Sequence, residues 1–185
     1  MKTVYIFLAE GFEEIEAVTP LDLLRRANID AKFVSTTNSL QVKGAHNITY
    51  TADILFEETS TFAMADAIVL PGGMPGTLNL LAHNGLCQLI DAYYKADKII
   101  SAICAAPLIL AKLGLLNQKT ATIYPGMESK LIGAKSSDDA VCLDGNILTS
   151  RGVGTAIAFA LKLIELLEGE KVAKTIKTDI VYQIS

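Results

Sequence analysis

Short, continuous runs of apolar and β-branched residues constrain the fold of this chain more than any other feature of its sequence. Three of these runs are TVYIFL at 3–8, AIVL at 67–70 and KIISAI at 98–103. They lack a regular polar–apolar alternation, which is typical of parallel strands that are buried on both faces. Amphipathic, helix-forming segments separate them, including EAVTPLDLLRRA at 16–27 and GLCQLIDAYYKA at 85–96. This order predicts a doubly wound α/β sandwich, with a mostly parallel sheet and helices on both of its faces.

The remaining segments fit the same domain. Strands are predicted for AKFVST at 31–36 and TATIYP at 120–125, and the polar stretch 38–47 is expected to form a hairpin with NITYTA at 47–52. AVCLDGNILTS at 140–150 is a second predicted hairpin, in which Asp144-Gly145 suits a type I′ turn. The clearest helix is GVGTAIAFALKLIELLEG at 152–169, which ends on a glycine C-cap. Without a linker or repeat, residues 1–185 are expected to form a single domain.

Composition excludes several classes of protein. The formal net charge is −4 and the chain has no basic cluster, which argues against nucleic acid or an anionic membrane as partner. No apolar run approaches the roughly 20 residues that cross a bilayer. The N-terminal MKTVYIFLAEGFEE is interpreted as the first strand rather than a signal peptide, because its apolar run is short and ends in acids. Three cysteines, an odd number, favour a reducing compartment, so a soluble cytoplasmic domain is expected.

The segment IISAICAAP at 99–107 places a lone cysteine between a buried strand and a helix. Pro107 is suited to the first turn of the helix-forming run LILAKL. A thiol at this corner meets the positive end of the helix dipole and free backbone N–H groups, which favour the nucleophilic thiolate. Buried cysteine is also a common small core residue, so the corner alone leaves both interpretations of Cys104 open. Cys87 and Cys142 have apolar surroundings and no CxxC spacing, so we expect packing roles and neither a zinc site nor a redox pair.

Three loops should converge at the carboxyl ends of the parallel strands: GFEEIEA at 11–17, PGGMPGT at 71–77 and the loop that begins at Cys104. Glu16 has apolar neighbours, and burial beside a thiolate would raise the pKa of its carboxyl so that the two acids share one proton. Glu13 and Glu14 are interpreted as acids that complement the N-terminus of a helix.

Backbone N–H groups complete the predicted site. Those of Gly73 and Ala105 are expected to face a developing alkoxide, and Gly72 is a further backbone donor. The alternative for this glycine pair is a simple tight turn. PGGMPG lacks the GK[ST] of a phosphate-binding loop.

Histidine argues against a cysteine peptidase, which needs a base within hydrogen-bond reach of its sulfur. The chain has two histidines, His46 in the predicted hairpin and His83 at a helix end, where a solvated capping role is expected. Neither lies on the strand next to the cysteine.

Four segments together resemble the DJ-1/PfpI (ThiJ/PfpI) superfamily and its DJ-1/YajL-like branch: AEGFEEIEAVTPLDLLRRANI, VLPGGMPGTLNL, AICAAP and TSRGVGTAIAFALKLIELLEG. The resemblance runs nearly end to end. It implies a flavodoxin-like (Rossmann-like) sandwich, a homodimer, Cys104 as an oxidation-sensitive nucleophile and Glu16 as its hydrogen-bond partner. The resemblance implies an activity that needs neither a metal nor an organic cofactor. Tyr124 stands where eukaryotic members carry a histidine, and His46 where relatives carry an arginine that reaches the partner subunit's site.

Two functions remain open from this resemblance. One is glutathione-independent glyoxalase or deglycase activity on small α-oxoaldehydes such as methylglyoxal. The other is a redox-responsive stress protein or chaperone that senses peroxide through oxidation of Cys104. The older intracellular-protease label is disfavoured, because Ala105 rather than histidine follows the cysteine.

Overall fold

A seven-stranded sheet of order β10-β11-β7-β6-β1-β2-β5 forms the centre of the computed structural model, which describes residues 1–58 and 62–183. All neighbouring pairs are parallel except β10 with β11, so the antiparallel strand is an edge. The strands are β1 (Thr3–Leu8), β2 (Asp30–Ser35), β5 (Ile54–Leu55), β6 (Ala67–Leu70), β7 (Ile99–Ile103), β10 (Val141–Asp144) and β11 (Ile147–Ser150).

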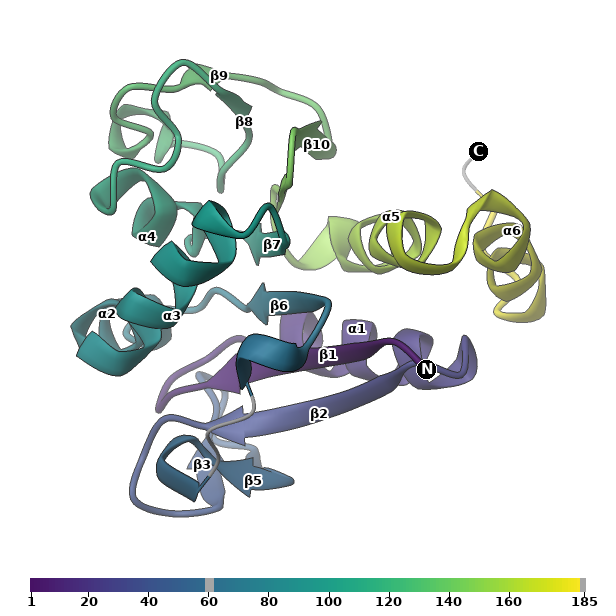
Figure 1. Cartoon of the computed structure of the whole chain (residues 1–185), viewed down its shortest axis with the longest axis horizontal. Helices are drawn as coiled ribbons and strands as arrows, with labels where there is room; N and C mark the ends of the chain where they lie inside the picture. The colour runs from purple at the N-terminus through teal and green to yellow at the C-terminus, as the bar shows by residue number, and fades with distance from the viewer. Residues whose placement is uncertain (59–61, 184–185) are drawn as a thin grey trace.

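Helices cover both faces of this sheet, which Figure 1 shows nearly edge-on. One face carries α1 (Glu14–Arg26), α5 (Ala156–Glu168) and α6 (Glu170–Asp179). The other carries α2 (Gly76–Ala82), α3 (Asn84–Lys95) and α4 (Pro107–Lys112). Short 3₁₀ turns lie at Phe56–Glu58, Phe62–Met64, Glu128–Lys130 and Val153–Thr155. The predicted doubly wound α/β sandwich is confirmed, although α6 was not among the predicted helices.

The first strand shows why its sequence is apolar throughout. Val4, Ile6 and Leu8 enter the core under α1 and α5, whereas Tyr5 and Phe7 enter the core on the opposite face. Because both faces of β1 are covered, each of these side chains leaves water on folding. Burial of one large apolar side chain stabilises the fold by about 1.5–3 kcal/mol.

Both predicted hairpins form. β3 (Gln41–Lys43) pairs antiparallel with β4 (Thr49–Thr51), and β10 pairs with β11. The type I′ turn is wrong, because Asp144 still belongs to the ladder and the two turn residues are Gly145 and Asn146. Only Gly145 of these two has a positive φ, +63°, as the first central residue of a type II′ turn does.

The strand predicted over 120–125 is shorter than expected. Only β8 (Thr120–Ala121) forms, and it pairs with β9 (Lys135–Ser136) outside the main sheet. Beyond it, the backbone N–H of Thr122 donates to the Thr149 hydroxyl, and that of Tyr124 donates to the carbonyl of Cys104. The N–H groups of Thr122 and Tyr124 therefore bond to the end of the main sheet, and the pairing of β8 with β9 stops before them.

No helix in residues 1–58 or 62–183 combines the length and apolarity needed to cross a membrane.

Candidate active site

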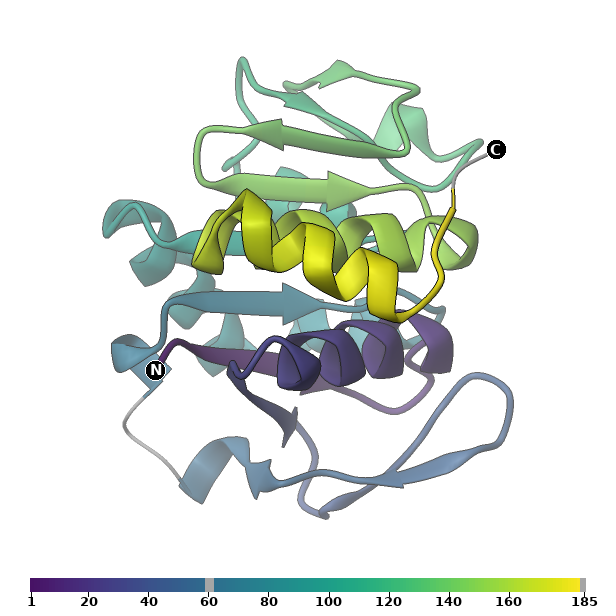
Figure 2. The same cartoon turned by 90° about the vertical axis from the view of Figure 1, so that its right-hand side faces the viewer.

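The loops after β1, β6 and β7 meet at one end of the sheet, as expected for neighbouring parallel strands. The N–H of Glu13 donates to the carbonyl of Gly72 at 3.0 Å, and the N–H of Gly76 donates to the carbonyl of Gly11 at 3.1 Å. A Cβ atom on Gly72 would lie 2.7 Å from the Cβ of Cys104. The three loops are therefore in direct contact. Figure 2 shows these strands running in one direction across the molecule.

Cys104 has a left-handed backbone conformation, with φ of +63°. This region is unfavourable for a residue with a side chain, so the surrounding structure must hold it there. Its N–H donates to the carbonyl of Ser150 at 2.9 Å, and its carbonyl accepts from the N–H of Tyr124 at 2.9 Å. Pro107 then begins α4, as predicted. A strained residue between a strand and a helix presents its side chain in the manner of other α/β nucleophiles.

Glu16 is fully buried on α1, beside the thiol. Its Oε2 accepts the backbone N–H of Gly72 at 2.9 Å, and hydrogen bonding with the Cys104 thiol and Gly72 acts to lower the pKa of the carboxyl. Oε1 is buried and has no partner among the residues that the structure describes. Gly72 was expected among the donors around the reacting oxygen, but its N–H serves the carboxyl instead. Burial is the main reason that the pKa of Glu16 is raised to about 7.

Opposing effects act on the sulfur. Burial raises the pKa of the Cys104 thiol to about 12 and the Glu16 carboxylate contributes, whereas hydrogen bonds from the N–H groups of Gly73 and Ala105 lower it. The expected preference for thiolate at this corner is thus opposed by burial. The contribution of Glu16 depends on its charge and vanishes when the carboxyl holds a proton. The charge of one group therefore affects the pKa of the other, so their titrations are coupled.

Tyr124 lies at the rim of this site and is half exposed. A Cβ atom on Gly152 would lie 3.4 Å from Cδ2 of the Tyr124 ring and 3.8 Å from Oε1 of Glu16. The ring and the unpartnered carboxyl oxygen therefore flank the same small space.

His46 contacts two acids of its own chain. Its Nδ1 lies 2.8 Å from Oε2 of Glu14 and 3.6 Å from Oε1 of Glu13. Its backbone N–H donates to Oε1 of Glu14 at 2.7 Å. Glu14 is buried by this contact, which its interpretation as a helix-terminal acid did not include. The residues that meet here are 32 positions apart, so no local signal in the sequence marks the pair.

The other predicted residues lie away from the thiol. His83 caps α3, since its Nδ1 accepts the N–H of Leu86 at 3.0 Å. It is half-buried rather than solvated, because its ring packs edge-on against Phe56 with centroids 4.5 Å apart. Burial raises the pKa of both Cys87 and Cys142, and each thiol donates to a backbone carbonyl.

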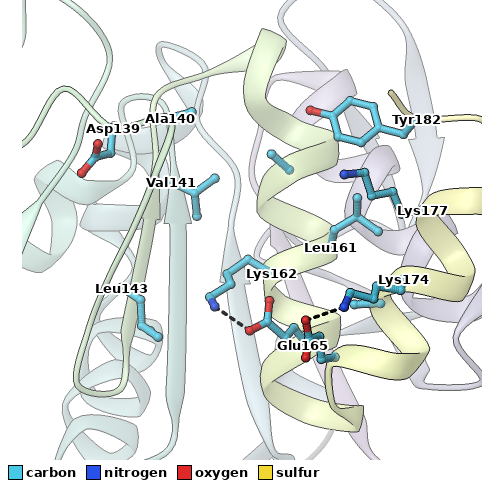
Figure 3. A pocket seen from close by; sticks show the side chains of 13 residues that line it. Asp139, Ala140, Val141, Leu143, Leu161, Lys162, Glu165, Lys174, Lys177 and Tyr182 are labelled. Carbon is cyan, nitrogen blue, oxygen red and sulfur yellow. Dashed lines mark hydrogen bonds and ion pairs between the residues drawn. The ribbon is translucent and has the colours of Figure 1, made fainter. Parts of the chain in front are cut away.

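A groove of about 530 Å³ lies elsewhere, between β10 and the α5–α6 pair (Figure 3). Val141 and Leu161 are part of its apolar wall, and Lys162 pairs with Glu165 at 2.7 Å on its rim. Neither cysteine nor histidine occurs among its described lining residues. The described lining of the groove therefore offers neither a thiol nor an imidazole, and the candidate catalytic site is the Cys104–Glu16 pair.

Comparison with known proteins agrees with this geometry. The family model described as "DJ-1/PfpI family" matches residues 2–166. Protein dj-1beta of Drosophila melanogaster is 37% identical over 180 residues, which cover 95% of this chain and 95% of that protein. Protein DJ-1 homolog B of Arabidopsis thaliana is 36% identical, and the match covers 91% of this chain but 38% of that longer protein. Oxidized DJ-1 of Toxoplasma gondii superposes with a TM-score of 0.94 at 33% identity, over the whole of both chains.

Proposed function

Because the chain belongs to the DJ-1/PfpI family, we propose that it is a cysteine-dependent enzyme that converts small 2-oxoaldehydes, such as methylglyoxal, to 2-hydroxy acids without glutathione. The observation that carries this proposal is the pairing of Cys104 with a buried carboxyl whose Oε1 has no partner among the described residues. Gly73 and Ala105 supply N–H groups beside the sulfur. The reaction needs a nucleophile, a proton carrier and oxyanion donors. Cys104 is the candidate nucleophile, and the buried carboxyl is the candidate proton carrier. The N–H groups of Gly73 and Ala105 are the candidate oxyanion donors.

The first step is addition. The Cys104 thiolate attacks the aldehyde carbon, a C–S bond forms, and the π electrons of the carbonyl move to its oxygen. The N–H groups of Gly73 and Ala105 stabilise that oxyanion, which then takes a proton to give a hemithioacetal. Glu16 removes the proton on the former aldehyde carbon while the neighbouring ketone oxygen takes a proton, which gives an enediol. Glu16 then returns its proton to the adjacent carbon as the hydroxyl of the first carbon loses its proton and becomes the thioester carbonyl. One carbon is oxidised and its neighbour reduced, so no external oxidant is consumed.

The second step is hydrolysis. The rearranged adduct is a 2-hydroxyacyl thioester on Cys104. Water attacks it, the C–S bond breaks, and the 2-hydroxy acid leaves as the thiol is regenerated. A carboxyl whose pKa is raised to about 7 is suited to this work, because both of its protonation states are populated near neutral pH.

The test is conversion of methylglyoxal to lactate in glutathione-free buffer. We expect Cys104→Ala and Glu16→Gln to abolish turnover. Cys87→Ala is the matched control, because Cys87 is a half-buried thiol away from the site and its removal should leave the rate unchanged. Wild-type turnover that persists in both the Cys104 and the Glu16 variants would rule out this mechanism.

A redox-responsive function is the second candidate, and the partial exposure of Cys104 supports it. The thiolate would attack one peroxide oxygen, the O–O bond would break, and sulfenic acid and water would form; a second peroxide would give sulfinic acid. A protonated Glu16 would then donate to a sulfinate oxygen. Mass spectrometry of native protein after peroxide treatment should show Cys104 oxidised much faster than Cys87 or Cys142. Equal oxidation of the three would count against this function.

The same proposal includes a homodimer in which His46 approaches the partner's site. Its side chain is 66% exposed while Nδ1 is held by Glu14, so the other edge of the ring faces outward. Ile15 and Ile48 are half exposed, and covering such residues favours association. Sedimentation should give a dimer, and His46→Ala should change the alkylation rate of Cys104. A monomer with an unchanged rate would refute this part.

A further inference from the structure

Two carboxylates and an imidazole meet where the first turn of α1 faces the β3–β4 hairpin. His46 Nδ1 lies 2.8 Å from Glu14 Oε2 and 3.6 Å from Glu13 Oε1. One donor atom from each of the three side chains lies within 4.8 Å of the other two. We propose that Glu13, Glu14 and His46 form a site for a divalent transition-metal ion of the zinc class. The proposal is independent of the reaction assigned to Cys104.

Two carboxylates face one imidazole at this point, so a protonated His46 balances at most one of their two negative charges. The Glu14 side chain is 5% exposed and that of Glu13 is 14% exposed. Among residues 1–58 and 62–183, the only ion-pair partner of either carboxylate is His46, which is neutral unless it is protonated. Buried glutamates are rare unless they are paired with a cation or bind a metal. A divalent ion would balance both negative charges at once.

The donors are held in place by contacts outside the proposed coordination sphere. The backbone N–H of His46 donates to Glu14 Oε1 at 2.7 Å, which leaves Oε2 directed at the imidazole. The hairpin itself is tied to the loop before α1, since the N–H of Ala45 donates to the carbonyl of Phe12 at 2.8 Å. A side chain at Gly44 would overlap the Glu14 carboxylate, so the close approach requires glycine. Such outer contacts orient ligands in established metal sites.

The distances and donor types favour zinc over calcium or magnesium. In a tetrahedral site with bonds of 2.0–2.2 Å, ligand atoms lie about 3.3–3.6 Å apart. The observed separation of 3.6 Å lies at the end of this range and that of 2.8 Å is shorter, so Nδ1 and Oε2 would have to move apart by a small side-chain rotation. Mixed imidazole and carboxylate donors suit zinc and its neighbours, whereas calcium and magnesium prefer oxygen alone. The ion would take the place of the proton between Nδ1 and Oε2, and a protonated His46 would release that proton to solvent.

The competing interpretation is a histidine–carboxylate ion pair that only fastens the hairpin. The chain offers a matched example, because His83 Nε2 lies 3.8 Å from Oε1 of Glu57 and pairs with no second carboxylate in the part of the chain that the structure describes. Removing the Glu57 carboxylate also takes one acid away from a histidine, but outside the proposed metal site. It therefore serves as the control for zinc affinity.

The experiment is isothermal titration of the full chain with Zn²⁺. It is carried out on Cys104→Ala protein so that the thiolate does not compete as a ligand. We expect one ion per chain with micromolar affinity. Adding His46→Ala or Glu13→Gln should weaken binding by more than about tenfold, the size that even outer contacts contribute. Adding Glu57→Gln should leave the affinity unchanged.

A spectroscopic readout separates coordination from indirect effects. Co²⁺ in place of Zn²⁺ should give a visible absorption band that changes when His46 is replaced. Thermal unfolding checks that each variant remains folded, which is expected for His46→Ala because the ring is largely exposed. Equal affinity in all variants, or binding weaker than about 1 mM, would mean an adventitious ion only and would overturn the proposal.

Discussion

Replacing Gly72 by alanine would place a methyl group where the loop after β6 meets Glu16 and Cys104. The new Cβ atom would lie 2.7 Å from Cβ of Cys104 and 2.8 Å from Oε2 of Glu16. It would also lie 2.9 Å from the carbonyl oxygen of Ile103, which is backbone and cannot rotate away. Since Gly72 has no positive φ, this substitution tests contact alone and adds no backbone strain.

The size of the effect follows from these contacts. Overpacking of a filled interior costs about 1–3 kcal/mol. Displacement of Glu16 also weakens the buried hydrogen bond from the Gly72 N–H, and a bond of this kind to a charged group contributes about 1.5–3 kcal/mol. We therefore expect the free energy of unfolding to fall by about 2–5 kcal/mol. In a chain of this length, each kcal/mol lowers the melting temperature by about 2–4 °C.

Two assays check this expectation. Urea unfolding measures the stability loss, and native alkylation by iodoacetamide measures the reactivity of Cys104, which should change when Glu16 moves. Gly154→Ala is the matched control, because a Cβ there meets nothing within 4 Å and its stability should change by less than about 0.5 kcal/mol. If Gly72→Ala matches the wild type in both assays, the close packing inferred around Cys104 is wrong.

Three further changes have defined outcomes. The alkylation rate of Cys104 should rise with pH up to about 7 and level off above it, because the ionised Glu16 carboxylate raises the pKa of the thiol, whereas in Glu16→Gln the rate should keep rising through neutral pH; a plateau near pH 7 in both proteins would contradict the coupling. Phe159→Ala empties a fully buried position of α5 and should cost about 3–5 kcal/mol in urea unfolding; a loss below 1 kcal/mol would show that the core is loosely packed there. His83→Ala removes the acceptor for the Leu86 N–H and should cost about 0.5–2 kcal/mol by the same assay, and an unchanged midpoint would argue against the cap.

The regular elements were largely predictable because their signals are local. A strand such as β6 is a run of neighbouring apolar residues, and α5 ends at Gly169, which has a positive φ of +90° as its C-cap role requires. The incorrect predictions also have physical causes. The segment 120–125 has the composition of a strand, but its backbone donors find partners at the sheet end, so composition alone overestimated its length.

The nucleophile was predictable and its surroundings were less so. Cys104 lies on a corner that follows from the residues on either side of it, and the apolar neighbours of Glu16 marked it as buried. The sequence analysis expected the Gly72 N–H to donate to the reacting oxygen, whereas it donates to Glu16. It also missed the Glu14–His46 contact, because both depend on segments that meet only after the sheet has formed.

The sequence by itself determined most of the strands and helices, although not α6 or the true length of the 120–125 strand, and that a thiol stands between a strand and a helix. These properties depend on residues within a few positions of one another. The tertiary structure decided the protonation of the site, because burial sets the pKa values of Glu16 and Cys104. That burial results from contacts between distant segments, such as the hydrogen bond from Gly72 to Glu16 across 56 positions of the chain. A carboxyl and a thiol that would titrate separately in an unfolded chain are thereby coupled in their titration.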